Sequence, residues 1–223
     1  MSEVALESRL STVVSRVRPS ATAAIAEAAR RMAEAGRSVI SLSTGELDFD
    51  TPEHIQQAAI DAMRQGHTRY TSVAGTLALK QAIIGKFQRD NQLTYAPDQV
   101  IASTGAKQII FNALLATLEA SDEVVFVAPY WVSYPEMVRL TGAEPVAVTP
   151  GAGDDFKLTP QTLAAALTSN TRWLLLNSPG NPSGALYSAA ELQALGEVLR
   201  GYPRVLVMSD DIYEPIVFEG RFA

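Results

Sequence analysis

The chain has 223 residues, of which 47% are hydrophobic and 19% charged, and its formal net charge at pH 7 is −6. This length and apolar content suit one large folded domain, alone or with an appendage, and argue against global disorder. The acidic balance, with no basic block, argues against nucleic acid or an anionic membrane as the main partner, and the absence of cysteine excludes disulfides and thiolate metal sites.

The beginning of the chain is expected to form an arm. Residues 1–20 have scattered charges and lack the apolar segment of a secretion signal, and no stretch of the chain approaches the ~18 apolar residues of a membrane span. We therefore expect a cytoplasmic protein. After the arm, apolar periodicity predicts helices over residues 19–36, 51–66 and 76–90, with a short strand over 38–45.

From residue 99 onward, strands and helices alternate. A strand over 99–104 leads directly into a helix, and the last predicted helix opens with a Ser-x-x-Glu capping box at Ser188 and Glu191. Further strands are predicted over 122–129, 144–149, 172–177 and 204–210, with helices over about 134–142, 159–167 and 188–200. Apolar strands that alternate with helices predict an α/β fold, a three-layer αβα arrangement around a mostly parallel sheet.

Ligands of such sheets bind at the carboxyl ends of the strands, so the residues after each strand are the candidate site. Gly105 and Ala106 open a helix, whose free N–H groups and dipole can hold an anion, and Lys107 adds charge. By itself this segment is better explained as an ordinary tight turn. Trp131 follows the next strand and is predicted either to stack on an aromatic ligand or to fill the core.

Polar groups also follow the strands over 172–177 and 204–210. The loop "NSPGNPSG" places the amides of Asn177 and Asn181 at a strand end, and its prolines restrict where they point. We predict a cis bond before Pro182, and another before Pro129. Asp210 ends the last strand and is predicted, rather than its neighbour, to hold a protonated ring nitrogen, since the Asp-x-x-Tyr spacing lets Tyr213 reach the same ligand.

The neighbouring acid, Asp211, is better explained as a helix cap. Together, these strand-end groups suit a ligand with an anionic tail, a flat ring, a basic ring nitrogen and an oxygen substituent. Pyridoxal 5'-phosphate has all four features. We predict its phosphate at residues 105–107, its ring against Trp131, its nitrogen on Asp210 and its phenolic oxygen between Asn181 and Tyr213.

The same segments resemble a known family. The chain is similar to the N-terminal part of class I/II, fold-type I pyridoxal-phosphate aminotransferases, in the aspartate aminotransferase branch, from about residue 18 to its end. The matching segments are "LSTGELDFDTPEHI", "TRYTSVAG", "STGAKQIIFNAL", "APYWVSYPEMV", "NSPGNPSGALYS" and "SDDIYE". The resemblance implies an arm and the first part of a small domain over 1–45, and a cofactor-binding large domain over 46–223, incomplete at the C-terminus.

The resemblance also implies roles for single residues. Gly45 would contact the substrate carboxylate, and Trp131 and Asn181 would touch substrate as well as cofactor. Tyr70 would reach the phosphate of a partner subunit's cofactor, which implies a homodimer with shared sites. Leu47 stands where the family usually has proline, and we expect little effect from this difference.

The family's Schiff-base lysine lies beyond the Asp-x-x-Tyr motif, whereas this sequence ends ten residues after Tyr213. None of its four lysines has the sequence context of that lysine: Lys80, Lys86, Lys107 and Lys157. We therefore expect a partial aminotransferase that is inactive alone. Its reaction would move an amino group between an aspartate-like or aromatic/prephenate-like amino acid and a 2-oxo acid.

Two alternatives remain open. One is a non-catalytic truncated chain that binds pyridoxal phosphate or pairs with a full-length homologue. The other is a different enzyme of the same fold, a carbon–sulfur lyase or a decarboxylase, because cofactor contacts are shared across reaction types. An unrelated nucleotide-binding α/β protein is disfavoured, since no phosphate-binding loop or ribose-binding acid is recognisable.

Overall fold

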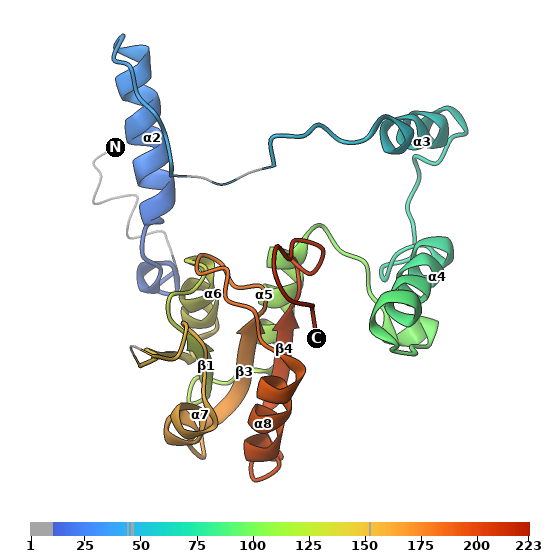
Figure 1. Ribbon diagram of the computed structural model, residues 1–223. Coiled ribbons are helices and arrows are strands. Elements are labelled where there is room, and N and C mark those ends of the chain that lie inside the picture. The colour runs from blue at the N-terminus through green and yellow to red at the C-terminus, as the bar shows by residue number, and fades with distance from the viewer. Residues whose placement is uncertain (1–10, 44, 46, 152) are drawn as a thin grey trace. The chain divides into compact units, whose positions relative to one another are not determined.

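The computed structural model describes residues 11–43, 45, 47–151 and 153–223, and the chain divides into two compact units (Figure 1). The sheet unit comprises Met1–Arg31 and Ile110–Ala223, and the helical unit comprises Met32–Ile109. The predicted domain boundary after residue 45 stays a prediction. In the part of the chain that the structure describes, no helix is long and apolar enough to cross a membrane.

The sheet unit is built on four parallel strands in the order β2-β1-β3-β4. Their bounds are β1 Glu123–Val127, β2 Glu144–Val148, β3 Thr171–Asn177 and β4 Leu206–Asp210. Each lies inside a segment that the sequence predicts to be a strand, or within one residue of it. The predicted α/β fold with a parallel sheet is thereby confirmed.

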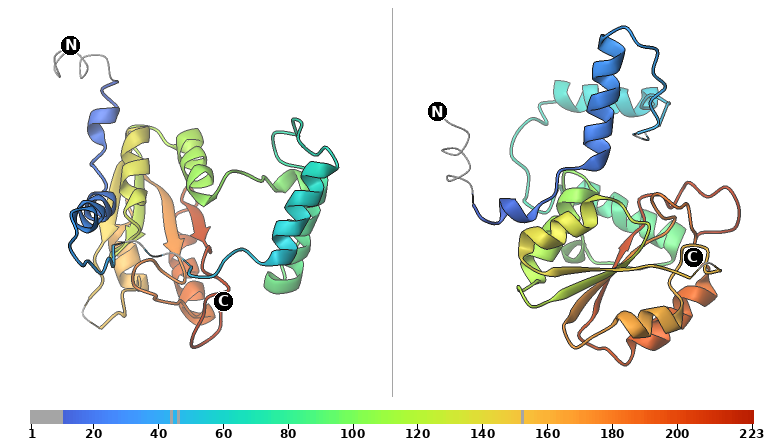
Figure 2. Two further views of the ribbon diagram at one scale, coloured as in Figure 1. Left: turned by 90° about the horizontal axis from the view of Figure 1, so that it is seen from above. Right: turned by 90° about the vertical axis from the view of Figure 1, so that its left-hand side faces the viewer.

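Helices cover both faces of this sheet, as the predicted three-layer arrangement requires. Their bounds are α5 Ala106–Thr117, α6 Ser133–Thr141, α7 Pro160–Ala166 and α8 Ala189–Leu199. The chain moves one way across the sheet from β1 to β2, and the other way from β2 through β3 to β4. Since crossovers between parallel strands are right-handed, this reversal places α6 on one face and α7 and α8 on the other (Figure 2, right).

Two clusters of buried side chains form the core, one on each face of β1 and β3. The first joins α5 and α6 to Val124, Phe126 and Leu175. The second joins α7 and α8 to Val125, Leu174 and Leu176. Because strand side chains alternate between faces, a continuous apolar run such as "LLL" in β3 is what a strand covered on both sides requires.

At the N-terminal end of the sheet unit, the 3₁₀ helix η1, Val14–Arg16, precedes helix α2, Ala21–Glu34, which continues into the helical unit. The backbone N–H of Arg18 donates to Glu136 Oε2 of α6 at 2.7 Å, and the same glutamate pairs with Arg139. These contacts attach the residues before α2 to the outer surface of α6.

The helical unit contains α3 Glu53–Arg64, α4 Leu77–Lys86, the π-helix η2 Phe87–Asn91 and the 3₁₀ helix η3 Pro97–Gln99. The helices predicted over 51–66 and 76–90 are confirmed. The predicted strands over 38–45 and 99–104 are wrong: residues 38–43 and 99–104, all of them described, form no strand.

A strand requires a hydrogen-bonded neighbour, which apolar sequence alone does not supply. Within the second of these segments, Ala102 N donates instead to the loop carbonyl of Ala74 at 3.0 Å. Ile40, in the first segment, is 89% exposed. The apolar pattern of these two segments is compatible with a strand, but it does not show whether a neighbouring strand is present to pair with them.

An ion pair ties the segment before α7 to the start of α8. Lys157 Nζ donates to Glu191 Oε1 at 2.6 Å, while Glu191 Oε2 accepts the backbone N–H of Ser188 at 2.7 Å. The Ser188–Glu191 capping box predicted from the sequence is confirmed. The hydrogen bond from Lys157, followed by the one from Ser188, lowers the pKa of Glu191 to about 2.

We predict that Glu191→Gln reduces the loss of stability at acidic pH. The folded-state pKa lies below the ordinary value of 4.5, so the ionised carboxylate stabilises the fold fully above that value. This contribution is lost as the pH falls from about 4.5 to about 2. Urea unfolding at a series of pH values from 2 to 6 gives the free energy of unfolding at each pH. Between about pH 4.5 and 2, this free energy should fall less steeply with decreasing pH in the variant than in the wild type.

The matched control for this test is Glu197→Gln, which removes a second carboxylate from α8. Glu197 pairs with Arg200 at 3.0 Å, with side chains 56% and 77% exposed, and exposed pairs contribute little to stability. The control should keep the wild-type slope. An unchanged slope in Glu191→Gln would contradict the role of the Lys157 ion pair.

Candidate functional site

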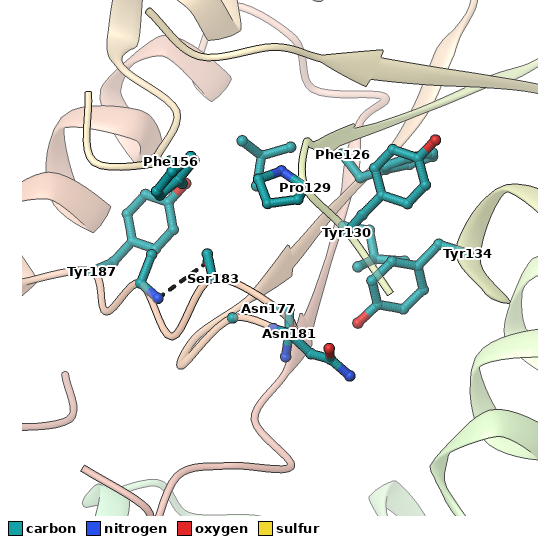
Figure 3. A pocket seen from close by; sticks show the side chains of 13 residues that line it. Phe126, Pro129, Tyr130, Tyr134, Phe156, Asn177, Asn181, Ser183 and Tyr187 are labelled. Carbon is teal, nitrogen blue, oxygen red and sulfur yellow. Dashed lines mark hydrogen bonds between the residues drawn. The ribbon is translucent and has the colours of Figure 1, made fainter. Parts of the chain in front are cut away.

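The reversal in strand order places a crevice between the ends of β1 and β3. The chain leaves β1 toward α6 on one face and leaves β3 toward α8 on the other, which is the arrangement where open α/β sheets bind ligands. A hollow that opens to solvent lies at this point, lined mainly by residues of β1, β3 and the loops that follow them. Figure 3 shows Phe156 and Tyr187 on one side of it, Tyr130 and Tyr134 on the other, and Asn181 beside it.

Asn177 connects the end of β3 to the end of β4. It pairs in register with Asp210, and its side-chain Nδ2 donates to the Asp210 carbonyl at 2.7 Å. Its Oδ1 accepts the backbone N–H of Asn181 at 2.7 Å. One amide therefore holds both the neighbouring strand and the loop that carries Asn181.

The loop after β3 is turned back on itself by prolines and glycine. Gly180 N donates to Ala185 O at 2.9 Å, closing the turn. The cis peptide bonds predicted before Pro182 and Pro129 are confirmed, and the structure adds a third, before Pro179, that the sequence analysis did not predict.

Asn181 and Tyr213 meet across this edge of the sheet. Asn181 Nδ2 donates to the Tyr213 hydroxyl oxygen over 3.4 Å, a long hydrogen bond between two half-buried side chains. Tyr213 lies in the turn that follows β4. An amide donor and a phenolic hydroxyl at this separation can both approach one ligand oxygen, as the sequence analysis expects for this pair.

The two adjacent acids after β4 have different surroundings. Asp210 is half-buried; its Oδ2 accepts the Tyr134 hydroxyl at 2.6 Å, and its Oδ1 faces Ile212 N at 3.4 Å. Asp211 is half-buried as well, but its Oδ1 accepts the hydroxyl of the exposed Ser209 at 2.6 Å. This difference agrees with the choice of Asp210 as the ligand-binding acid, which stays a prediction.

Trp131 packs partly into the core. Its ring meets Tyr134 edge-to-face at 5.4 Å, and it lies against the cluster formed by α5, α6, β1 and β3. The core-filling interpretation of Trp131 therefore holds in part. Since the side chain is only half-buried, a ring face toward a ligand remains compatible with this packing, and stacking stays a prediction.

Tyr134 is a site residue that the sequence analysis missed. It is 2% exposed, and burial, together with the hydrogen bond to Asp210, raises the pKa of its hydroxyl far above the ordinary value. The signal that could have pointed to it is a tyrosine in the first turn of α6, three residues after Trp131. Its partner lies 76 residues further along the chain.

The remaining predicted residues belong to the helical unit, and their roles stay predictions. Gly105 has a φ of +91° and directly precedes α5, so Ala106 begins the helix as expected. Gln108 Oε1 accepts the Ser103 hydroxyl at 2.6 Å and Thr104 N at 3.2 Å, which closes this turn. The exposed members of the set are Gly45, Tyr70, Gly105 and Lys107.

Comparison with known proteins gives one consistent result. The family model described as aminotransferase class I and II matches residues 37–223. An aspartate/prephenate aminotransferase of Cereibacter sphaeroides is 54% identical over 210 residues, which cover 94% of this chain and 52% of that protein. The chain thus spans about half the length of the curated relatives it matches.

Solved structures agree with this result. The aspartate aminotransferase from Rhizobium meliloti is 48% identical with a TM-score of 0.92, over 95% of this chain and 53% of that one. The aspartate aminotransferase from Thermus thermophilus with maleate is 40% identical with a TM-score of 0.91, over 96% of this chain and 56% of that one.

We predict that Asn177→Ala lowers the free energy of unfolding by about 1–3 kcal/mol, because it leaves the Asn181 N–H and the Asp210 carbonyl without their partner. Chemical denaturation measures the loss, and the Asn181 amide should exchange its hydrogen faster. Asn170→Ala, which truncates the exposed asparagine just before β3, should stay within about 0.5 kcal/mol of the wild type. Equal losses in the two variants would contradict this role for Asn177.

Proposed function

Because this chain belongs to the class I and II aminotransferase family, we propose that it forms the cofactor-binding part of a pyridoxal-phosphate-dependent aminotransferase. The observation that carries the proposal is the cluster of Asn181, Asp210 and Tyr213 at the carboxyl edge of the sheet, held together by Asn177. A cytoplasmic location is part of the same proposal.

The chemistry of this cluster fits pyridoxal phosphate. A half-buried carboxylate at a strand end suits a protonated ring nitrogen, since a buried charge needs an opposite partner. The amide of Asn181 and the hydroxyl of Tyr213 suit a phenolic oxygen. When bound, the cofactor supplies an electron sink for the electrons released at the substrate's α-carbon.

The residues of this chain would bind and orient the cofactor. Asp210 would keep the proton on the ring nitrogen, Asn181 and Tyr213 would donate to the ring oxygen, and Trp131 would pack against the ring. The helix start at Gly105–Lys107 offers free N–H groups to the phosphate. Because these protein groups would already be in position before the cofactor binds, they would stabilise the ring with its nitrogen protonated.

The proposed substrates are an amino acid and a 2-oxo acid. The name of the Cereibacter sphaeroides relative points to aspartate or prephenate, and the Thermus thermophilus structure contains maleate, a dicarboxylate. Asn181, Trp131 and Gly45 are the residues proposed to touch the substrate. Of the possible amino-group donors, aspartate is therefore the first one to test.

A homodimer belongs to the proposal as well. The resemblance assigns Tyr70 to the cofactor phosphate of a partner subunit, and the side chain of Tyr70 is fully exposed, as such a contact requires. The aminotransferase site would then be completed by residues of two chains.

We predict that the chain binds pyridoxal phosphate without a covalent bond. Its four lysines include one in the sheet unit, Lys157, whose amine is engaged with Glu191 at 2.6 Å. After incubation with the cofactor and reduction with borohydride, mass spectrometry should find no stoichiometric adduct on a single lysine. A stoichiometric adduct, together with transaminase turnover by this chain alone, would overturn the proposal.

We predict transamination when the chain is joined to the corresponding C-terminal half of the Cereibacter sphaeroides relative. Aspartate and a 2-oxo acid are the substrates, and formation of the new amino acid is measured. Asp210→Ala should lower turnover by at least about 100-fold, because an unprotonated ring is a poor electron sink. Asp211→Ala should retain most of the activity, since its carboxylate bonds to Ser209.

Two results of this experiment would count against the proposal. Loss of activity in Asp211→Ala but not in Asp210→Ala would reverse the assignment of the acid. Release of ammonia or of a thiol, without transfer of the amino group, would favour the lyase alternative.

A further inference from the structure

The contact between Tyr134 and Asp210 joins a helix to a distant strand. The Tyr134 hydroxyl donates to Asp210 Oδ2 at 2.6 Å, although α6 connects β1 to β2 and Asp210 ends β4 at the other side of the sheet. A hydrogen bond to a carboxylate is shorter and stronger than one between neutral groups. This contact therefore fixes the position of the acid more firmly than the strand alone would.

The tyrosine ring is itself held in place. It is 2% exposed and lies between two aromatic neighbours, Trp131 at 5.4 Å and Phe126 at 6.2 Å between ring centroids. Buried rings in such packing have few alternative rotamers, so the hydroxyl stays at one point. The donor is thus positioned before any ligand arrives.

Further contacts limit how Asp210 can turn. Its second carboxylate oxygen, Oδ1, faces the backbone N–H of Ile212 at 3.4 Å, and its backbone carbonyl accepts from Asn177 at 2.7 Å. With Oδ2 engaged by Tyr134, rotation of the carboxylate about its last side-chain bond would break the strongest of these contacts.

The direction of the Tyr134 hydrogen bond does not change over the working pH range. Burial, and then the hydrogen bond to Asp210, raises the pKa of the tyrosine far above its ordinary value. The hydroxyl therefore remains protonated and keeps a proton to donate to the carboxylate.

We infer that Tyr134 is a positioning residue that orients the Asp210 carboxylate toward the ring nitrogen of a bound pyridine ligand. The inference rests on the proposed function, and it makes a narrower statement: Tyr134 contributes to the affinity for a ligand only through that nitrogen. The affinity for a ligand of the same shape without the nitrogen should not depend on the Tyr134 hydroxyl.

The test uses two ligands that cannot react with lysine. Pyridoxine 5'-phosphate has the ring nitrogen, the phenolic oxygen and the phosphate but no aldehyde, and its analogue has a C–H group in place of the nitrogen. Calorimetry gives the dissociation constant of the chain for each ligand. Tyr134→Phe should weaken binding of pyridoxine 5'-phosphate on the order of tenfold, and of the analogue by less than about twofold.

Two further variants separate orientation from general stability. Thr171→Val removes a buried hydroxyl at the opposite end of β3, which accepts Thr168 N at 2.9 Å, and should leave the ratio of the two dissociation constants unchanged. Adding Tyr134→Phe to Asp210→Ala should not alter the ratio beyond the effect of Asp210→Ala alone, since the hydroxyl acts through that carboxylate.

The outcomes distinguish this inference from the proposed function. If the wild-type chain binds neither ligand, the proposed function fails and this inference fails with it. If the wild type binds, but Tyr134→Phe weakens both ligands equally or neither, the proposed function stands and the inference is overturned.

A second variant covers the case in which Tyr134→Phe does not fold. Site-specific Tyr134→3-fluorotyrosine retains the hydroxyl and nearly the same shape, and it supplies one fluorine resonance. Addition of pyridoxine 5'-phosphate should shift this resonance, while the analogue should leave it near its original position. Equal shifts with the two ligands would overturn the inference.

Discussion

Both faces of β3 have to be covered, because Leu174 and Leu176 point to one face and Leu175 to the other, and all three are buried. A sheet covered on both faces needs helices above and below it, and the crossovers that supply these helices make the strands parallel. Parallel strands end at the same edge. The place where ligand-binding groups can gather is therefore a consequence of how this strand is buried.

The same constraint explains why a buried strand ends in a rigid, polar loop. After the three leucines, Asn177 is the first residue whose side chain leaves the core, and it donates to one neighbour and accepts from another at 2.7 Å each. The closed turn that follows keeps Asn181 near Tyr213. The buried core residues of β3 are therefore followed directly by residues of the candidate site, and Asn177 is the residue at which one ends and the other begins.

The sequence predicts those parts of the fold that depend on local pattern. The four strands of the sheet are apolar runs between helices, and Asn177 and Asp210 were found because they stand directly after such runs. The segments 38–45 and 99–104 have the same kind of apolar pattern, yet the first is not a strand in its described residues and the second is not one anywhere, since a strand also needs a partner.

Other parts of the site depend on contacts that the local sequence does not show. Tyr134 occupies an ordinary position in a helix, and its role depends on an aspartate 76 residues away. The cis bond before Pro179 was not predicted, because the local sequence alone does not distinguish a cis from a trans X-Pro bond.

The contacts of the site are also far apart in the order of synthesis. The Asn177–Asp210, Asn181–Tyr213 and Tyr134–Asp210 pairs are separated by 33, 32 and 76 residues. Contacts of this kind form after local helices, because the intervening chain has to be ordered first. On a ribosome, α6 and its tyrosine emerge and fold well before β4 has been made. Until β4 joins the sheet, Tyr134 has no carboxylate to meet, so the ring-nitrogen half of the site should be among the last features that a newly made chain acquires.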